Sequence, residues 1–185
     1  YSVMRASAPF LTIEQALLGF VYARPLHGYE IYRQLSSASG LWQVWRLKQS
    51  QLYALLTKLE GEHYLTATLQ PQDARPPRKL YALSEAGRNA FDQWLKTPVP
   101  HGRQMRIEFL AKLYFAQRQD SVMALQLLDQ QALVCHQWLE AHQAQDAAKQ
   151  GEDFFVYAVQ QFRTSQVEAF LAWLAICRRA LEASV

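Results

Sequence analysis

The sequence predicts a mainly α-helical protein that contains one small β-hairpin. The chain has 185 residues with only 7 glycines and 7 prolines, a low count that favours helices over a turn-rich β-protein. Hydrophobic residues make up 50% of the chain and charged residues 19%, so a chain of this length can bury a core. Apolar residues follow helical spacing in most of the chain, and strand-like alternation is confined to residues 64–84.

The first predicted helix lies in LTIEQALLGFVYARP, residues 11–25. Thr12 followed by Gln15 fits a capping box, in which each side chain satisfies an otherwise unpaired backbone amide. Pro25 ends the helix because proline cannot continue one. The apolar face of this helix consists of Ile13, Leu17, Leu18 and Val21.

Two further helices follow. HGYEIYRQLSSASG predicts a helix that buries Ile31 and Leu35 and closes at Gly40. LKQSQLYALLTKLEGEHYL predicts a third helix, whose opposite face carries small, polar or basic side chains. Its narrow buried stripe consists of Leu52, Leu55, Leu56 and Leu59.

Two alternating segments, YLTATLQ and KLYALS, predict a β-hairpin. The connector PQDARPPR is expected to form its loop, because Pro76 and Pro77 cannot donate hydrogen bonds inside a strand. Ser84 with Glu85 then predicts the start of another helix. That helix carries Phe91, Trp94 and Leu95.

The predicted elements follow the order of a winged helix-turn-helix domain: three helices, a strand, a basic loop, a second strand and a fourth helix. In such a domain the third helix enters the DNA major groove. Residues 1–98 are therefore predicted to bind DNA. Residues 1–100 hold 11 Lys and Arg against 7 Asp and Glu, a balance of +4, whereas residues 101–185 hold 8 against 9, a balance of −1. This asymmetry permits a polyanionic partner for the first half, although chance could also produce it.

The segment TPVPHG, residues 97–102, predicts a domain boundary. Beyond it nearly all of residues 99–185 follows helical spacing, with more apolar surface than the segment can bury on itself. A second copy of the chain is the simplest partner that could bury this apolar surface, so this region is predicted to be a helical dimerisation domain. The seam positions are Leu125, Leu128, Ala132, Cys135, Leu139, Val167, Phe170, Leu171, Leu174, Cys177 and Leu181.

Three blocks carry a family resemblance. LHGYEIYRQL, LYALLTKLEGEHYL and PPRKLYALSEAGR resemble the signature blocks of the PadR family of bacterial transcriptional regulators, in the family's order and spacing. The resemblance covers roughly the first half of the chain. The second half resembles, in pattern and length only, the virulence-activator-like C-terminal helices of one PadR subgroup.

The resemblance implies a dimeric repressor that binds operator DNA and releases it when a small aromatic or phenolic effector binds. It also implies a recognition helix, residues of the second helix near the DNA backbone, and a basic wing. The residues implied to contact DNA are Tyr29, Arg33, Lys48, Gln49, Ser50, Gln51, Tyr53, Thr57, Arg75, Arg78 and Lys79.

The chain departs from the family pattern at three positions. The family commonly has glycine just past the recognition helix, where this chain has His63, and we therefore expect a wider or less stable turn there. Lys48 and Ser50 occupy slots where the family has small residues, which is expected to change the operator sequence that is read.

Each feature also has a purely structural interpretation. The lysines and arginines could form a solvated face, and Tyr29 and Tyr53 could be aromatic residues at the edge of the core. The aromatic residues of the second half are more often packing than an effector site. Three of them, Phe109, Trp138 and Trp173, are retained as effector-binding candidates. A helical protein–protein adaptor without DNA binding is the alternative function.

Nothing in the sequence predicts an enzyme, a cofactor or a metal site. The five histidines are dispersed, and no nucleophile elbow or glycine-rich phosphate loop occurs. Cys135 and Cys177 are expected to be inert thiols. Without an apolar run long enough to span a bilayer, and without the apolar core of a signal peptide near the start, the expected location is the cytoplasm.

Overall fold

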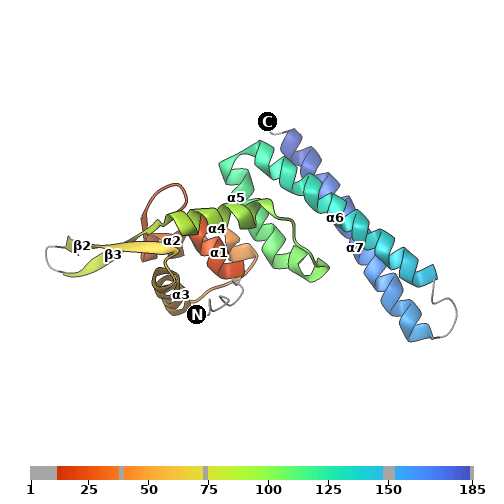
Figure 1. The fold of residues 1–185 in the computed structure, drawn as a ribbon, viewed down its shortest axis with the longest axis horizontal. Helices are drawn as coiled ribbons and strands as arrows, with labels where there is room; N and C mark the ends of the chain where they lie inside the picture. Colours follow the sequence, from red (N-terminus) through yellow and green to blue (C-terminus); the bar gives the residue numbers. More distant parts are fainter. Residues whose placement is uncertain (1–11, 38–39, 73–74, 148–152, 184–185) are drawn as a thin grey trace, which may run out of the picture. The chain divides into compact units, whose positions relative to one another are not determined.

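The computed structural model describes residues 12–37, 40–72, 75–147 and 153–183, and it divides into two compact units, residues 1–94 and 95–185. The first unit contains helices and a three-stranded antiparallel sheet, and the second is helical (Figure 1). This confirms the predicted fold class, a winged helix-turn-helix domain followed by a helical region. The assignment of DNA binding to residues 1–98 and of dimerisation to residues 99–185 stays a prediction.

Three helices form the core of the first unit: α1 (Thr12–Phe20), α2 (Gly28–Leu35) and α3 (Gln49–Gly61). Each buries most of the apolar face that its spacing predicts, and Ile31, Leu52 and Leu56 have no exposed surface. Ile13 of α1 and Leu55 of α3, which were also predicted on these faces, are only half-buried. Thr12 is the first residue of α1 rather than its cap. The three helices pack against one another, with α2 and α3 forming the helix-turn-helix pair.

Helix α2 ends five residues earlier than predicted, because two serine hydroxyls bond its last carbonyls. Ser36 Oγ donates to Tyr32 O at 2.7 Å, and Ser37 Oγ donates to Gln34 O at 2.9 Å. Such side-chain bonds compete with a further helical turn. A short 3-10 helix, η1 (Leu41–Gln43), which the sequence did not predict, then leads toward α3.

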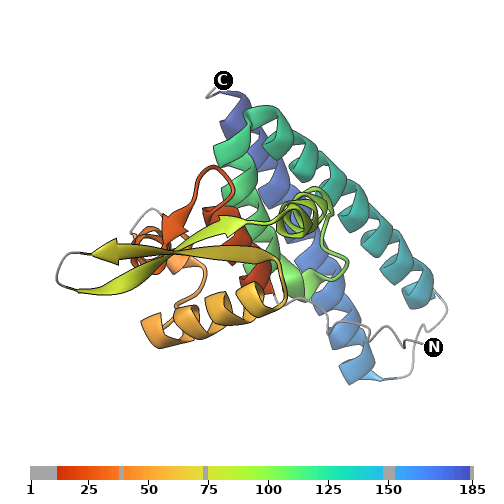
Figure 2. The same cartoon turned by 60° about the vertical axis from the view of Figure 1, so that its left-hand side comes forward.

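The wing consists of β2 (Leu65–Gln72) and β3 (Arg75–Leu83), and it extends beyond the helices of its unit (Figures 1 and 2). Both strands are longer than predicted, and the expectation that Pro76 and Pro77 lie in the loop is wrong. They are tolerated in β3 because this end of the strand pairs on one side only and the register shifts between Gln70 and Gln72.

A third strand, β1 (Leu26–His27), pairs with β3 through Leu26 opposite Tyr81 and His27 opposite Leu80. It was not predicted, because two residues are too few to show an alternating pattern. It is the chain entering α2, and it therefore ties the start of α2 to the base of the wing.

The turn after α3 is regular, so the expected widening is wrong. His63 takes a left-handed conformation with φ 63°, the Tyr64 amide donates to Leu59 O at 2.9 Å, and the His63 amide donates to Glu60 O at 3.1 Å. This is the Schellman arrangement, which closes most often on glycine. His63 performs the same closure at the steric cost of its Cβ.

Replacing His63 by glycine is expected to stabilise the protein by about 0.5–1 kcal/mol, since glycine adopts the left-handed conformation without that cost. Urea denaturation of the two proteins would measure the difference. His63→Ala is the control, because alanine keeps the Cβ and should bring no such gain. Equal stability of the glycine and alanine variants would show that the strain is not there.

Helix α4 (Glu85–Lys96) begins as predicted at Ser84, whose Oγ accepts the Gly87 amide at 3.0 Å. The same hydroxyl donates to His63 O at 2.7 Å, so one side chain links the end of α3 to the start of α4. Phe91, Trp94 and Leu95 are buried, as the sequence predicts.

The second unit contains α5 (Leu110–Gln119), α6 (Ser121–Ala147) and α7 (Phe154–Glu182), preceded by a 3-10 turn η2 (Gly102–Gln104) and a π-helical turn η3 (Met105–Phe109). Helices α6 and α7 run antiparallel side by side (Figures 1 and 2). Among the described residues, none of the helices is long and apolar enough to cross a membrane.

Two buried polar side chains hold the segment that leads into these helices. The Gln131 amide accepts the Val99 N–H at 2.7 Å and donates to Val99 O at 3.2 Å. Lys112 donates to Thr97 O at 2.6 Å and pairs with Glu108 at 3.2 Å, and burial lowers the pKa of its ammonium. Both groups are satisfied inside the unit, as buried polar groups must be.

Candidate nucleic-acid interface

The outward face of α3 is formed by small, uncharged side chains. Ser50, Ala54 and Thr57 follow one another at helical spacing and are all exposed, while Leu52, Leu56 and Leu59 hold the other side of the helix in the core. Short side chains let a helix approach another surface closely, and the two hydroxyls can donate or accept hydrogen bonds. The predicted residues Gln49, Ser50, Gln51 and Thr57 are therefore accessible.

The cations around this face fall into two groups. Lys58 Nζ lies 2.5 Å from the buried Glu14 carboxylate of α1, and Lys79 Nζ lies 2.6 Å from Glu60 of α3. The hydrogen bonds to Glu14 and Glu60 raise the pKa of Lys58 and of Lys79 respectively. These two ammonium groups are thus already neutralised within the unit.

Lys79 was predicted to contact DNA, and its ion pair gives it a structural role as well. The pair joins β3 of the wing to the wing-facing side of α3, at a distance where a charged hydrogen bond is strong. Lys79 therefore positions the wing relative to the helix. A DNA contact by the same ammonium stays a prediction.

The second group consists of Arg46, Lys48 and Arg78. Among the described residues none of the three has a carboxylate within ion-pair distance. Lys48 directly precedes α3, and Arg46 lies two residues earlier with its guanidinium carbon 5.7 Å from the Trp42 ring centre. Arg46 was not among the residues predicted to contact DNA, although it lies only two residues before Lys48.

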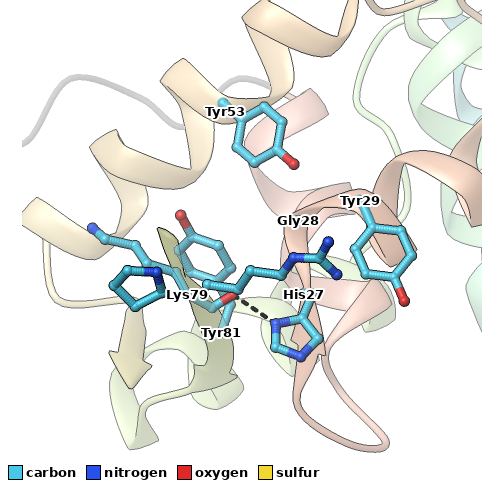
Figure 3. A pocket seen from close by; sticks show the side chains of 8 residues that line it. His27, Gly28, Tyr29, Tyr53, Lys79 and Tyr81 are labelled. Atoms are coloured by element: carbon cyan, nitrogen blue, oxygen red, sulfur yellow. Dashed lines mark hydrogen bonds between the residues drawn. The ribbon is translucent and has the colours of Figure 1, made fainter. Parts of the chain in front are cut away.

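A hollow of about 370 Å³ lies between α2, α3 and β3 (Figure 3). Tyr53 of α3 and Tyr29 of α2 border it, and both are partly exposed. Arg78 lines it with its guanidinium carbon 5.4 Å from the centre of the Tyr29 ring, a cation–π distance. The residues that line the hollow are His27, Gly28, Tyr29, Tyr53, Pro77, Arg78, Lys79 and Tyr81, and none is acidic.

The floor of the hollow is rigid. His27 Nδ1 lies 3.1 Å from Lys79 O, which joins the start of α2 to the wing (Figure 3). The His27 and Tyr29 rings are stacked with centres 6.1 Å apart. A Cβ on Gly28 would lie 2.5 Å from Tyr53 Cε1, so the absence of a side chain at Gly28 lets the Tyr53 ring pack against α2.

This arrangement can hold an anion. Two tyrosine side chains and one guanidinium border a hollow without a lining carboxylate, next to the first turn of α2, where backbone amides carry partial positive charge. Tyr29 and Tyr53 are therefore at the surface and not only at the core edge. Tyr81 is buried below them, and burial raises the pKa of its phenol.

The structure says less about three other predicted DNA contacts. Arg33 is exposed on α2 without an ion pair among the described residues. The side chain of Arg75 lies outside the described part of the chain. Gln51 accepts the Lys48 amide at 3.0 Å, so its carbonyl helps to begin α3 while its amide nitrogen stays available.

The three effector candidates do not come together in one site. Phe109 is fully buried and packs edge-on against Trp173, with ring centres 5.9 Å apart. Trp138 lines a hollow of the second unit that neither Phe109 nor Trp173 lines. Cys135 and Cys177 are free thiols, and burial raises the pKa of both. No cluster of three or more potential metal ligands occurs within the described ranges.

Comparison with known proteins finds similarity mainly in the first unit. Residues 17–93 match the Transcriptional regulator PadR-like family. The chain is 31% identical over 103 residues to the negative transcriptional regulator PadR of Bacillus subtilis, covering 56% of each protein. It is 28% identical over 96 residues to the probable transcriptional regulator Rv1176c of Mycobacterium tuberculosis, covering 52% of this chain and 50% of that one. The chain thus spans about half the length of the curated relatives it matches.

Among solved structures, Bacillus subtilis PadR in complex with operator DNA is similar, with a TM-score of 0.48 and 26% identity over 94% of this chain and 99% of that one. The virulence activator AphA of Vibrio cholerae has a TM-score of 0.40 and 20% identity over 92% of this chain and 94% of that one.

Proposed function

We propose that this chain, whose residues 17–93 match the PadR-like family of transcriptional regulators, is a sequence-specific DNA-binding repressor that acts as a dimer. The observation that carries the proposal is the outward face of α3, which is small and uncharged. Arg46, Lys48 and Arg78 lie around it, and none of them has an ion-pair partner among the described residues. A family of transcriptional regulators also agrees with the expectation that the chain is not an enzyme.

In this proposal α3 enters the major groove. Ser50, Thr57 and the glutamines beside them read base edges, since hydroxyl and amide groups can both donate and accept hydrogen bonds. Arg46, Lys48 and Arg78 contact phosphates and fix the position of the helix without reading sequence. Tyr53 and Tyr29 hold one further phosphate in the hollow beside Arg78.

A gel shift on DNA from just upstream of the chain's own gene tests the proposal. We expect a specific complex whose affinity falls steeply with salt, because cations that contact phosphates release counterions. A twofold dimer should protect two half-sites about one or a few turns apart, near 10 bp per turn. An adaptor without DNA binding would give no shift at low salt and would instead capture a defined protein.

The proposal that the chain forms a dimer rests on the exposed apolar residues of α7. Only Val167 and Leu174 of its 29 residues are buried. Phe155, Phe162, Ala169 and Ile176 recur every seven residues and are all exposed, the two phenylalanines by 71% and 66% and Ile176 by 56%. A seven-residue repeat forms a continuous stripe along a helix and is typical of a helix–helix seam. The stripe fits the same helix of a second copy.

Replacing Phe155 and Ile176 together by serine is expected to weaken the dimer roughly 100-fold or more, since each side chain buries its apolar surface in both copies. Sedimentation across a range of concentrations would measure the dissociation constant. The matched control replaces the flanking exposed residues Gln161 and Glu168 by serine. If both double variants dimerise equally well, the stripe is not the interface.

The family resemblance adds release of DNA by a small aromatic or phenolic effector to this proposal. Its support within the chain is the hollow beside Trp138 in the second unit.

A further inference from the structure

Ala54 lies at the middle of the outward face of α3. An α-helix turns by about 100° per residue, which places Ala54 almost directly opposite the buried leucine stripe of the helix. Ser50 lies one turn before it and Thr57 one turn after it, and all three side chains are exposed. A surface that approaches this face therefore meets the Ala54 methyl group between two hydroxyl-bearing side chains.

The charged residue one turn beyond Ala54 is engaged elsewhere. Lys58 Nζ lies 2.5 Å from the carboxylate of the buried Glu14 of α1 and 3.9 Å from that of Glu62. A lysine that is bonded to its own unit in this way does not reach back over the preceding turn of the helix. The centre of the outward face therefore presents a methyl group to its partner, and neither a charge nor a hydrogen-bonding group.

The edges of the four bases differ in what they offer to a methyl group. In the major groove guanine, adenine and cytosine present hydrogen-bond donors or acceptors, whereas thymine also presents its 5-methyl group. A polar edge pressed against Ala54 would lose its bound water and gain no partner, which is costly. The thymine methyl group loses no hydrogen bond there, and its burial against another methyl group is favourable. Ala54 therefore favours a thymine opposite it.

The contact can select a sequence only if α3 takes one register on the duplex. The cations without a carboxylate partner among the described residues are placed to fix that register. Lys48 and Arg46 lie at the start of α3, whereas Arg78 lies on the wing and lines the hollow beside Tyr53. Phosphate contacts from both places would position the helix along the groove. The same base pair then lies opposite Ala54 in every complex.

We propose that Ala54 is a specificity-determining residue, which selects a thymine near the centre of each operator half-site through the 5-methyl group of that base. The inference rests on the proposed function, since it requires α3 to lie in the major groove. Ser50 and Thr57 then read the base pairs on either side by hydrogen bonds. Cytosine that carries a 5-methyl group offers the same apolar contact, so 5-methylcytosine should bind better than cytosine at this position.

The test begins with a footprint of the full chain on DNA from just upstream of its own gene, which defines the protected operator. Each thymine of one half-site is then replaced by deoxyuridine, which lacks only the methyl group. We expect one thymine near the centre whose replacement weakens binding about 4-fold, the effect of losing one buried methyl group. Replacing that thymine in both half-sites should weaken binding about 15-fold, as measured by fluorescence anisotropy.

Two variants assign the sensitive thymine to a side chain. Ala54→Gly removes the methyl group, so it should bind the thymine and deoxyuridine operators equally well. Glycine also weakens the helix, but that loss affects both operators and cancels in the ratio of their affinities. Thr57→Ser is the matched control, because it removes a methyl group one turn away and keeps the hydroxyl. Whatever its effect on affinity, the control should retain the preference for thymine over deoxyuridine.

The outcomes separate this inference from the proposed function. A protected operator without a deoxyuridine-sensitive thymine overturns the inference and leaves the proposed function standing. A preference for thymine that Ala54→Gly keeps, or that Thr57→Ser loses instead, places the methyl contact on another residue and also overturns it. If no DNA is protected even at low salt, the proposed function fails and the inference fails with it. The deoxyuridine series uses the parent protein, so its result does not depend on the folding of a variant.

Discussion

A variant in which Arg46, Lys48 and Arg78 are all replaced by alanine is expected to bind the operator about 100-fold more weakly, or worse. These three cations border α3 or the wing and have no carboxylate partner among the described residues. Each phosphate contact contributes close to one unit to the slope of log affinity against log salt. The slope should therefore fall by about three units, measured by fluorescence anisotropy over a salt series.

The control for this variant removes three exposed arginines of the second unit, Arg106, Arg118 and Arg179. The control variant loses the same number of positive charges as the first variant. The comparison therefore separates the effect of local phosphate contacts from the effect of the protein's net charge. An equal loss of affinity in the control, or an unchanged salt slope in the first variant, would show that these three cations do not contact DNA.

Lys58 and Lys79 are less suitable for this test. Removing Lys58 would take away the ammonium group that lies 2.5 Å from the buried carboxylate of Glu14, and losing a charged partner of a buried carboxylate is destabilising. Removing Lys79 would release the wing from Glu60. Either change would lower DNA binding through the structure, whether or not the ammonium contacts phosphate.

Gly87→Ala is expected to destabilise the protein by about 3 kcal/mol, at the upper end of the usual overpacking cost. A Cβ at this position would lie 2.0 Å from Tyr64 O and 3.0 Å from Tyr64 C. That carbonyl cannot move easily, because it accepts both the amide and the hydroxyl of Ser84, at 3.2 and 3.1 Å. Helix α4 would have to shift away from the start of β2.

Gly61→Ala is the matched control for this prediction. Gly61 is the last residue of α3, and a Cβ there would meet no atom within 4 Å. Alanine has the better helix propensity by about 1 kcal/mol, so the control should be neutral or more stable. Urea denaturation compares the two. A Gly87→Ala protein within about 1 kcal/mol of the parent would show that α4 is not fixed against Tyr64.

The spacing of apolar residues predicted the helices well, because each helix buries one face and the apolar residues on that face recur every three or four positions. The stripe of Leu52, Leu56 and Leu59 determined which side of α3 is in the core, and the opposite side is therefore exposed. Ser84 was recognised as a cap because its pattern is local, and its hydroxyl does accept the Gly87 amide.

Local pattern was insufficient where a partner from elsewhere in the chain decides the outcome. Strand β1 exists because Leu26 and His27 meet β3, more than fifty residues away. Pro76 and Pro77 lie in a strand because that end of β3 has a neighbour on one side only. His63 closes α3 as a glycine would, because two backbone hydrogen bonds hold it in the left-handed conformation.

The candidate DNA interface shows the same division. The sequence alone determined the order of the three helices and the wing, the family resemblance and the set of basic and polar residues predicted to contact DNA. Only the tertiary structure decided which cations have a carboxylate partner. Glu14 lies far along the chain from Lys58, and Glu60 lies on α3 whereas Lys79 lies on β3. Charge pairing depends on distance in space, and a sequence reports distance only along the chain.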